Sequence, residues 1–321
     1  MQIIQTVSEL RKTFANQSSN GKNNIGFVPT MGNLHAGHIA LVTQAKQHAA
    51  HIPKSCVVVS IFVNPLQFSP NEDLANYPRS LAADCEKLAA AGCDIVFTPS
   101  VAEMYADFDG KNLNQSMTID PPPIANVLCG ATRLSHFAGV ATVVMKLFNI
   151  VQPDVALFGK KDFQQLFIIK EMVRQFNLPI EIIAGETVRE ASGLALSSRN
   201  GYLNDKQRTS ASQLNRALQG IIDVIKNGNK NFVKLEQQAR MQLTSQGWEV
   251  DYISIRSSAT LQPASRIDKN LIVLGAAKIS NKAAGKTRLI DNIELCITDW
   301  LAYNYAFLKF KVTHAKNHAQ I

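Results

Sequence analysis

Short apolar runs alternate with segments of helical periodicity through the first half of the chain. Apolar runs bounded by turn residues are typical of buried strands, and apolar residues three or four positions apart are typical of helices. The pattern predicts strands at residues 25–28, 56–62, 95–97, 155–158 and 180–183, and helices at residues 36–50, 80–91, 139–151 and 163–176. Because strands that alternate with helices form parallel sheets, we predict an α/β domain over residues 1–184.

The pattern changes near Gly185. It predicts helices at residues 205–226 and 231–246, followed by strands at residues 250–256, 270–278 and 287–292. This order predicts a smaller α+β domain over residues 185–292. Ligands of parallel sheets bind beyond the carboxyl ends of the strands, so we expect an active site there or between the domains. Residues 107–123, rich in Asn, Asp and Pro, are predicted to form a loop.

The last segment, residues 293–321, is set apart by its aromatic content. It contains Trp300, Tyr303, Tyr305, Phe307 and Phe310, and it ends in a stretch with Lys311, His314, Lys316 and His318. We interpret it as an appended tail that covers an apolar surface. The alternative is a segment that binds a membrane surface or a partner, because aromatic residues beside basic ones suit both.

Composition narrows the class of protein. The 321 residues are 46% hydrophobic and carry a net charge of +8, as in soluble globular proteins. We expect no membrane span and no signal peptide. The five cysteines are scattered, which indicates reduced thiols in a cytoplasmic protein without a zinc site or disulfides. The basic residues are spread along the chain, so small anionic substrates are expected rather than nucleic acid.

The most informative motif spans residues 26–38 and reads GFVPTMGNLHAGH. An apolar strand stops at Pro29, turns through Gly32, and leads into a helix whose first turn carries His35 and His38. A helix N-terminus offers unpaired N–H groups to phosphate, and two imidazoles add donors for charge that develops during reaction. Gly37 would let a nucleotide approach the backbone. The alternative is a capped helix with two surface histidines.

This motif resembles the HxGH signature of nucleotidyltransferases, and its surroundings resemble the pantoate–β-alanine ligase family within that group. Ordered segments carry the resemblance from the first residues to about Asn292, among them Pro29-Thr30-Met31-Gly32 and Phe158-Gly159-Lys160-Lys161-Asp162. The other segments lie at residues 62–68, 77–79, 142–144, 146–154, 163–166, 187–190, 193–195 and 197–203. The resemblance implies a Rossmann-like sheet, a homodimer formed through the N-terminal domain, and two substrates joined through an adenylate. ATP would activate (R)-pantoate as pantoyl adenylate, and β-alanine would then displace AMP.

The resemblance also implies roles for individual residues. For catalysis it implies His35, His38, Lys161, Ser197, Ser198 and Arg199; for ATP binding, Met31, Gly37, Gly159, Lys161, Asp162 and Val188; for pantoate binding, Met31, Gln67 and Gln165. Further candidates are Asn64, Arg133 and His136. Mg²⁺ is expected mainly on the phosphates of ATP. Asp84 is the candidate metal-side acid, although the adjacent Ala83 lacks an oxygen that some relatives supply; the alternative for Asp84 is a solvent-facing helix acid.

Some positions depart from the family pattern. Cys129 replaces a usual Glu, Leu134-Ser135 replaces Pro-Gly, Glu186 replaces Pro, and Ser192 replaces Asp. We expect these departures to change local loop geometry, and they weaken the case for a functional role of residues 129–133. Two other functions stay open: an HxGH enzyme that transfers a nucleotidyl group without amide formation, and a nucleotide-responsive binding protein with a decayed site.

Overall fold

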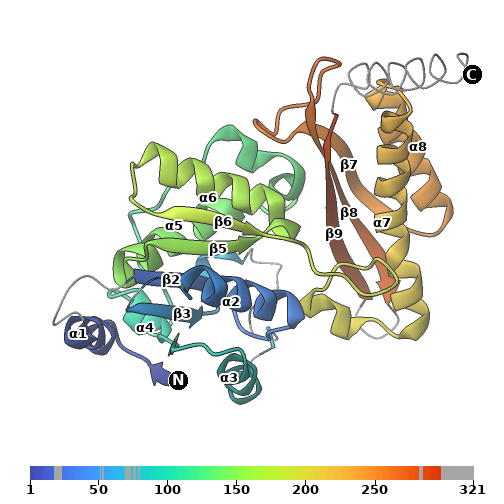
Figure 1. Ribbon diagram of the computed structural model, residues 1–321. Coiled ribbons are helices and arrows are strands. Elements are labelled where there is room, and N and C mark those ends of the chain that lie inside the picture. The colour runs from blue at the N-terminus through green and yellow to red at the C-terminus, as the bar shows by residue number, and fades with distance from the viewer. Residues whose placement is uncertain are drawn as a thin grey trace, which may run out of the picture.

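The computed structural model describes residues 1–17, 24–50, 52, 54–68, 74, 77–78, 80–281 and 285–297 (Figure 1). The first half of the chain forms a six-stranded sheet in the order β1-β4-β3-β2-β5-β6, and every pair of neighbouring strands is parallel. Its strands are β1 (Gln2–Ile4), β2 (Asn24–Thr30), β3 (Ser55–Ile61), β4 (Ile95–Phe97), β5 (Val155–Gly159) and β6 (Glu181–Gly185).

Helices cover both faces of this sheet. They are α1 (Val7–Gln17), α2 (Ala36–Ala49), α3 (Leu81–Ala90), α4 (Val101–Met104), α5 (His136–Val151) and α6 (Phe163–Gln175), with short 3₁₀ turns η1 (Pro65–Gln67), η2 (Pro123–Asn126), η3 (Leu128–Ala131), η4 (Lys160–Asp162) and η5 (Ser198–Tyr202). Phe27 packs on the α1 and α5 side, whereas Val28 packs on the α2 and α3 side. Residues of a strand alternate between the two faces, so both faces of β2 must be apolar.

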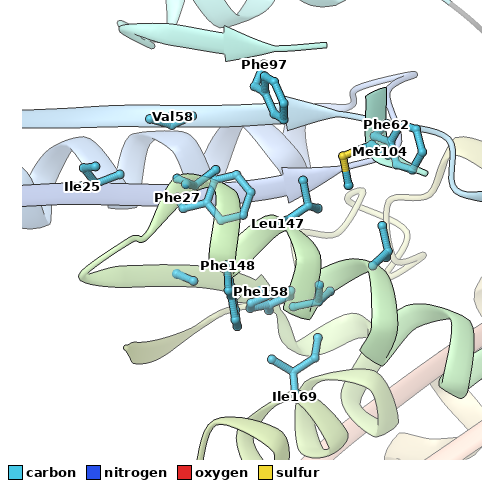
Figure 2. Close-up of a cluster of buried hydrophobic side chains, with 14 of the residues drawn as sticks. Ile25, Phe27, Val58, Phe62, Phe97, Met104, Leu147, Phe148, Phe158 and Ile169 are labelled. Atoms are coloured by element: carbon cyan, nitrogen blue, oxygen red, sulfur yellow. The ribbon is translucent and has the colours of Figure 1, made fainter. Parts of the chain in front are cut away.

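Aromatic and aliphatic side chains together fill the core between the sheet and α5 (Figure 2). The ring centroids of Phe27 and Phe148 lie 6.5 Å apart at an interplanar angle of 71°. Those of Phe148 and Phe158 lie 6.3 Å apart in a similar edge-to-face arrangement. This packing links β2, α5 and β5.

The second half forms a smaller domain with α7 (Asp205–Lys226), α8 (Phe232–Ser245) and an antiparallel sheet in the order β7-β8-β9. The strands are β7 (Glu249–Ser257), β8 (Asn270–Asn281) and β9 (Gly285–Cys296). One face of this sheet packs on α7 and α8, and the other packs on η2, α5 and α6 of the first domain. The sheet therefore lies between the two helices and the N-terminal domain (Figure 1).

The predicted fold class, a parallel α/β domain followed by a smaller α+β domain, is confirmed. The boundary between residues 184 and 185 stays a prediction. β9 continues to Cys296, which pairs with Asn270, so residues 293–296 of the predicted tail lie in the sheet. Their apolar side chains at Ile293 and Leu295 pack on the C-terminal core, which explains the continuation. The aromatic residues of the tail lie outside the described residues. Among the helices that the structure describes, none combines the length and apolar content that crossing a membrane requires.

Candidate active site

A cavity of about 800 Å³ lies at the carboxyl ends of β2 and β5, under the C-terminal sheet. The N-terminal domain contributes the first turn of α2, η1, one side of α5 and the start of α6. Segment 186–188, η5 and the start of β9 close the cavity from the other side. This is the predicted location, at the strand ends of a parallel sheet and between two domains.

The two histidines begin α2 and hold each other in place. His35 is the N-cap, and its Nδ1 atom accepts the backbone N–H of Gly37 at 3.1 Å. Nδ1 of His38 accepts the backbone N–H of His35 at 3.3 Å, and the ring centroids lie 4.1 Å apart. Because each Nδ1 atom is an acceptor, the proton of each neutral ring is on Nε2. A Cβ atom at Gly37 would lie 2.8 Å from His35 Cε1, so a side chain there would displace the His35 ring from its capping position.

Both histidines are neutral near pH 7. Burial, with help from the positive charge of Lys161, lowers the pKa of His35 from 6.5 to about 4. Burial and the neighbouring His35 lower the pKa of His38 to about 3. The helix is capped as the alternative expected, but both side chains are half-buried and line the cavity, and their role in catalysis stays a prediction. Each neutral ring of this tautomer has one Nε2–H donor, and it lies at a helix N-terminus, where an anion is favoured.

Asp84 holds the loop that carries Met31 into the cavity. Its carboxylate accepts the backbone N–H groups of Asn33 and Leu34, each at 2.8 Å, and the hydroxyl of Ser80 at 3.1 Å. The side chain has no exposed surface, so the solvent-facing alternative is wrong.

The placement of Asp84 does not fit a metal ligand either, since both carboxylate oxygens are already hydrogen-bonded under the loop. Within the described part of the chain, no three His, Cys, Asp or Glu side chains gather in a way that could hold a metal ion. The described residues therefore offer no cage of their own for Mg²⁺, a cation that prefers several oxygen ligands.

Gln67 lies on η1 and faces Met31, with its Nε2 atom 2.6 Å from the Met31 sulfur. Asn64 supports it from behind, because its Nδ2 atom donates to Gln67 Oε1 at 3.3 Å and to the carbonyl of Gly139 at 3.1 Å. The hydroxyl of Tyr105 donates to Asn64 Oδ1 at 2.6 Å. Asn64 lines the cavity, yet its amide is used to orient Gln67.

His136 and Arg133 form a second support for Gln67. Nδ1 of His136 lies 2.8 Å from the Gln67 carbonyl, and Nε2 lies 2.9 Å from Arg133 Nη1. A carbonyl only accepts, so Nδ1 carries the proton and Nε2 accepts from the guanidinium. Ser135, one of the departures, has φ 62°, a left-handed conformation that the usual glycine adopts without strain.

Several of the residues predicted to contact ATP come from two turns. Lys161 and Asp162 lie in η4, the turn that follows β5, and Lys161 Nζ lies 3.6 Å from the Asp162 carboxylate. Burial opposes ionisation of Asp162, but Lys161 and Arg199 hold the pKa of its carboxyl below the ordinary value. Ser197 caps η5, where its hydroxyl accepts the N–H of Arg199 at 3.2 Å.

Most of the predicted residues meet in this cavity. It is lined by Met31, His35, Gly37, His38, Asn64, Gln67, Arg133, Gly159, Lys161, Asp162, Gln165, Val188, Ser197, Ser198 and Arg199. Asp84 and His136 lie behind the lining and support it. The roles in catalysis and binding stay predictions.

The cavity is also lined by Lys286, Thr287 and Arg288 of β9 and by Tyr77, for which no role was predicted. Arg288 donates from Nε to Asp251 at 2.7 Å, and both terminal nitrogens lie 3.7 Å from the sulfur of Cys129. The available signal was the polar run Lys286-Thr287-Arg288 at and before the start of the predicted strand 287–292.

Two of the departures, Cys129 and Glu186, also contribute to the contact between the domains. The sulfur of Cys129 lies 3.1 Å from the hydroxyl of Tyr252 in β7. Glu186 pairs with Lys160 at 2.5 Å, and the same lysine reaches Glu294 of β9 at 2.7 Å. Ser192 accepts the N–H of Leu194 at 3.4 Å within its own loop. Each of these three replacements has a local partner, and Glu186 adds a carboxylate to the cavity lining beside η4.

Comparison with known proteins agrees with this geometry. A family model described as pantoate-beta-alanine ligase matches residues 2–294. The chain is 62% identical over 297 residues to pantothenate synthetase of Methylobacillus flagellatus, covering 92% of this chain and 99% of that one. It is 51% identical over 296 residues to pantothenate synthetase of Thiobacillus denitrificans, covering 92% and 97%.

Solved structures give the same result. Pantothenate synthetase of Thermus thermophilus matches with a TM-score of 0.79 and 39% identity, covering 91% of this chain and 99% of that one. Pantoate-beta-alanine ligase of Francisella tularensis, complexed with beta-gamma ATP and beta-alanine, matches with a TM-score of 0.67 and 34% identity, covering 91% and 97%. The resemblance predicted from the motifs is thus confirmed, and the chain belongs to the pantoate-beta-alanine ligase family.

Proposed function

We propose that the cavity joins (R)-pantoate to β-alanine through a pantoyl adenylate. As a pantoate-beta-alanine ligase, the chain condenses pantoate and β-alanine with ATP. In the first step a carboxylate oxygen of pantoate attacks the α-phosphorus, and pyrophosphate leaves. In the second step the amine of β-alanine attacks the acyl carbon, and AMP leaves with that oxygen.

The pair of neutral histidines at the N-terminus of α2 is the observation that carries this proposal. Charge grows on the phosphoryl oxygens as pyrophosphate leaves, and preorganised donors stabilise it. The Nε2–H groups of His35 and His38 provide such donors, and the basic side chains of Lys161 and Arg199 line the same cavity. Since both rings are neutral and carry the proton on Nε2, they can donate these hydrogen bonds without first gaining a proton from solvent.

Pantoate would lie between η1 and α5. Gln67 and Gln165 offer amides for its hydroxyl and carboxylate groups, while Met31 and the α5 residues Val140 and Val143 provide an apolar wall. A branched aliphatic acid with a hydroxyl group matches both sets of groups. The C-terminal sheet above the cavity would keep water away from the mixed anhydride until β-alanine arrives.

The other sequence-based expectations belong to the same proposal. Mg²⁺ would be held by phosphate oxygens of ATP, and no step above depends on a protein ligand to it. We also propose a cytoplasmic homodimer; unpaired thiols at all five cysteines favour a reducing compartment. The alternative of a nucleotidyltransferase without amide formation is not favoured by the family assignment.

Exchange of labelled pyrophosphate into ATP tests the first step. We expect exchange when pantoate and Mg²⁺ are present and β-alanine is omitted. Omitting pantoate is the control and should abolish exchange. Exchange that requires β-alanine, or that occurs equally without pantoate, would contradict the adenylate as the first product.

A further inference from the structure

Asn292 of β9 holds the turn that carries Lys161. Its Nδ2 atom donates one hydrogen bond to the carbonyl of Lys160 and one to the carbonyl of Lys161, each at 2.9 Å. The residue is buried, with 5% of its surface exposed. An amide NH₂ group has two donors, and both are used on consecutive carbonyls of one turn.

Asn292 is itself fixed by its neighbours. Its backbone N–H donates to Asp291 Oδ1 at 2.7 Å. Arg189 donates to both carboxylate oxygens of Asp291, at 2.7 and 2.8 Å, and to the carbonyl of Asn292 at 3.2 Å. Asn215 of α7 adds a bond to Asp291 at 3.0 Å. A bidentate, largely buried Arg–carboxylate pair has a defined geometry, so the Asn292 amide has little freedom.

This contact crosses between the domains. Asn292 belongs to the antiparallel sheet, whereas η4 follows β5 of the parallel sheet. Lys160 reaches Glu294 on the same strand, so β9 contacts this turn through both backbone and side chain. Lys161 then projects from a backbone whose position depends on the C-terminal domain. A lysine side chain is flexible, and a fixed backbone reduces the number of places its ammonium group can reach.

We propose that Asn292 is a positioning residue, which sets the place of the Lys161 ammonium group at the phosphates through the two hydrogen bonds to η4. The proposal rests on the phosphate role of Lys161 given under the proposed function. Asn292 does not line the cavity, so its effect must pass through the turn. The predicted consequence is a loss in the rate of adenylation rather than in the use of pantoate.

A double-mutant cycle tests this role. We expect Asn292→Ala to lower the single-turnover rate of adenylation about 10- to 100-fold, because small displacements of a catalytic group are costly. Apparent KM for pantoate should stay within about threefold of the parent value. In a Lys161→Ala background, Asn292→Ala should lower the rate by less than about threefold, because residues that act as a unit are not additive.

Asn270→Ala is the matched control, since this exposed asparagine begins β8 and pairs with Cys296, four residues along β9 from Asn292. It should keep the parent rate. Asn292→Ser, too short to reach either carbonyl, replaces Asn292→Ala if that protein does not fold. A folded Asn292 variant with the parent rate, or losses that multiply fully in the double mutant, would overturn the proposal. If Lys161→Ala alone keeps the parent rate, the role assigned to Lys161 fails instead, and the inference fails with it.

Discussion

The Oδ1 atom of Asp84 accepts the backbone N–H of Leu34 at 2.8 Å, a contact between residues that lie 50 positions apart in the chain. The other carboxylate oxygen accepts the N–H of Asn33. Asn33 has φ 50° and Gly32 has φ 80°, so the loop before α2 passes through two left-handed residues. Asp84 compensates for this conformation by pairing the N–H groups that the loop turns inward.

Replacing Asp84 by Asn should therefore disturb the loop rather than metal binding. The amide has one acceptor where two N–H groups need one each, which costs about 1–3 kcal/mol of stability. We expect a lower Tm and slower adenylation. The Mg²⁺ concentration for half-maximal rate should stay within about twofold. A tenfold rise in that concentration, with Tm unchanged, would make Asp84 a metal ligand.

Because His35 and His38 are half-buried in the neutral form, we expect the free energy of unfolding to decrease as the pH falls. Their folded pKa values, about 4 and about 3, lie below the 6.5 of an unfolded histidine. From about pH 6.5 down to about pH 4 the unfolded chain therefore binds more protons, and the free energy of unfolding must decrease as pH falls. Urea unfolding of the parent and of His38→Asn measures this. The variant should show a shallower slope over that range; equal slopes would contradict burial of a neutral His38.

Variants of the adjacent residues Gln165 and Gln164 on α6 should distinguish an effect on pantoate binding from an effect on stability. Gln165 lines the cavity, whereas Gln164 is buried and bonds the backbone of Ile124, Val127 and Cys129. Gln165→Ala should raise KM for pantoate about 10- to 100-fold with KM for ATP nearly unchanged, as expected for the loss of a buried hydrogen bond of about 1–3 kcal/mol. Gln164→Ala is the control and should lower Tm without this selectivity. If ATP use falls and pantoate use holds, Gln165 belongs to the nucleotide site.

Removal of the tail should leave the chemistry intact. Because β9 runs to Cys296 and the N–H of Ile297 bonds the carbonyl of Lys269, the cut belongs after Ile297. We expect the chain of residues 1–297 to form pantothenate at the parent rate at a temperature where circular dichroism shows it folded. Lower solubility is compatible with this result. A folded truncation that has lost adenylation would place the tail in the active site.

Local sequence was sufficient to predict the histidine pair, because a strand, Pro29, Gly32 and a helix start lie within a few residues of one another. Helical and strand periodicity likewise predicted both sheets. The edge strand β1 was not predicted, since three residues, of which one is buried, carry little pattern. The contact of Asn292 with Lys160 and Lys161 was not predictable either. It joins residues about 130 positions apart through backbone carbonyls, which no side-chain pattern records.

For Asp84 the sequence offered too many interpretations rather than none. Its place in the chain fits a metal-side acid, an exposed helix acid and a loop support equally well. Burial decides among them, and burial depends on how α3 packs beside the loop before α2. The same holds for Asn64, whose position before Pro65 is typical of a turn, whereas its amide in the structure orients Gln67.

The claim that the reaction passes through a pantoyl adenylate is tested most directly by following a carboxylate oxygen of pantoate. Pantoate labelled with ¹⁸O in its carboxylate should be converted with ATP and β-alanine, and the AMP and pyrophosphate analysed by mass spectrometry. A pantoyl adenylate requires one labelled oxygen in AMP, because the attacking carboxylate oxygen stays on the α-phosphorus. Label in pyrophosphate, or AMP without label while pantothenate forms, would contradict the account.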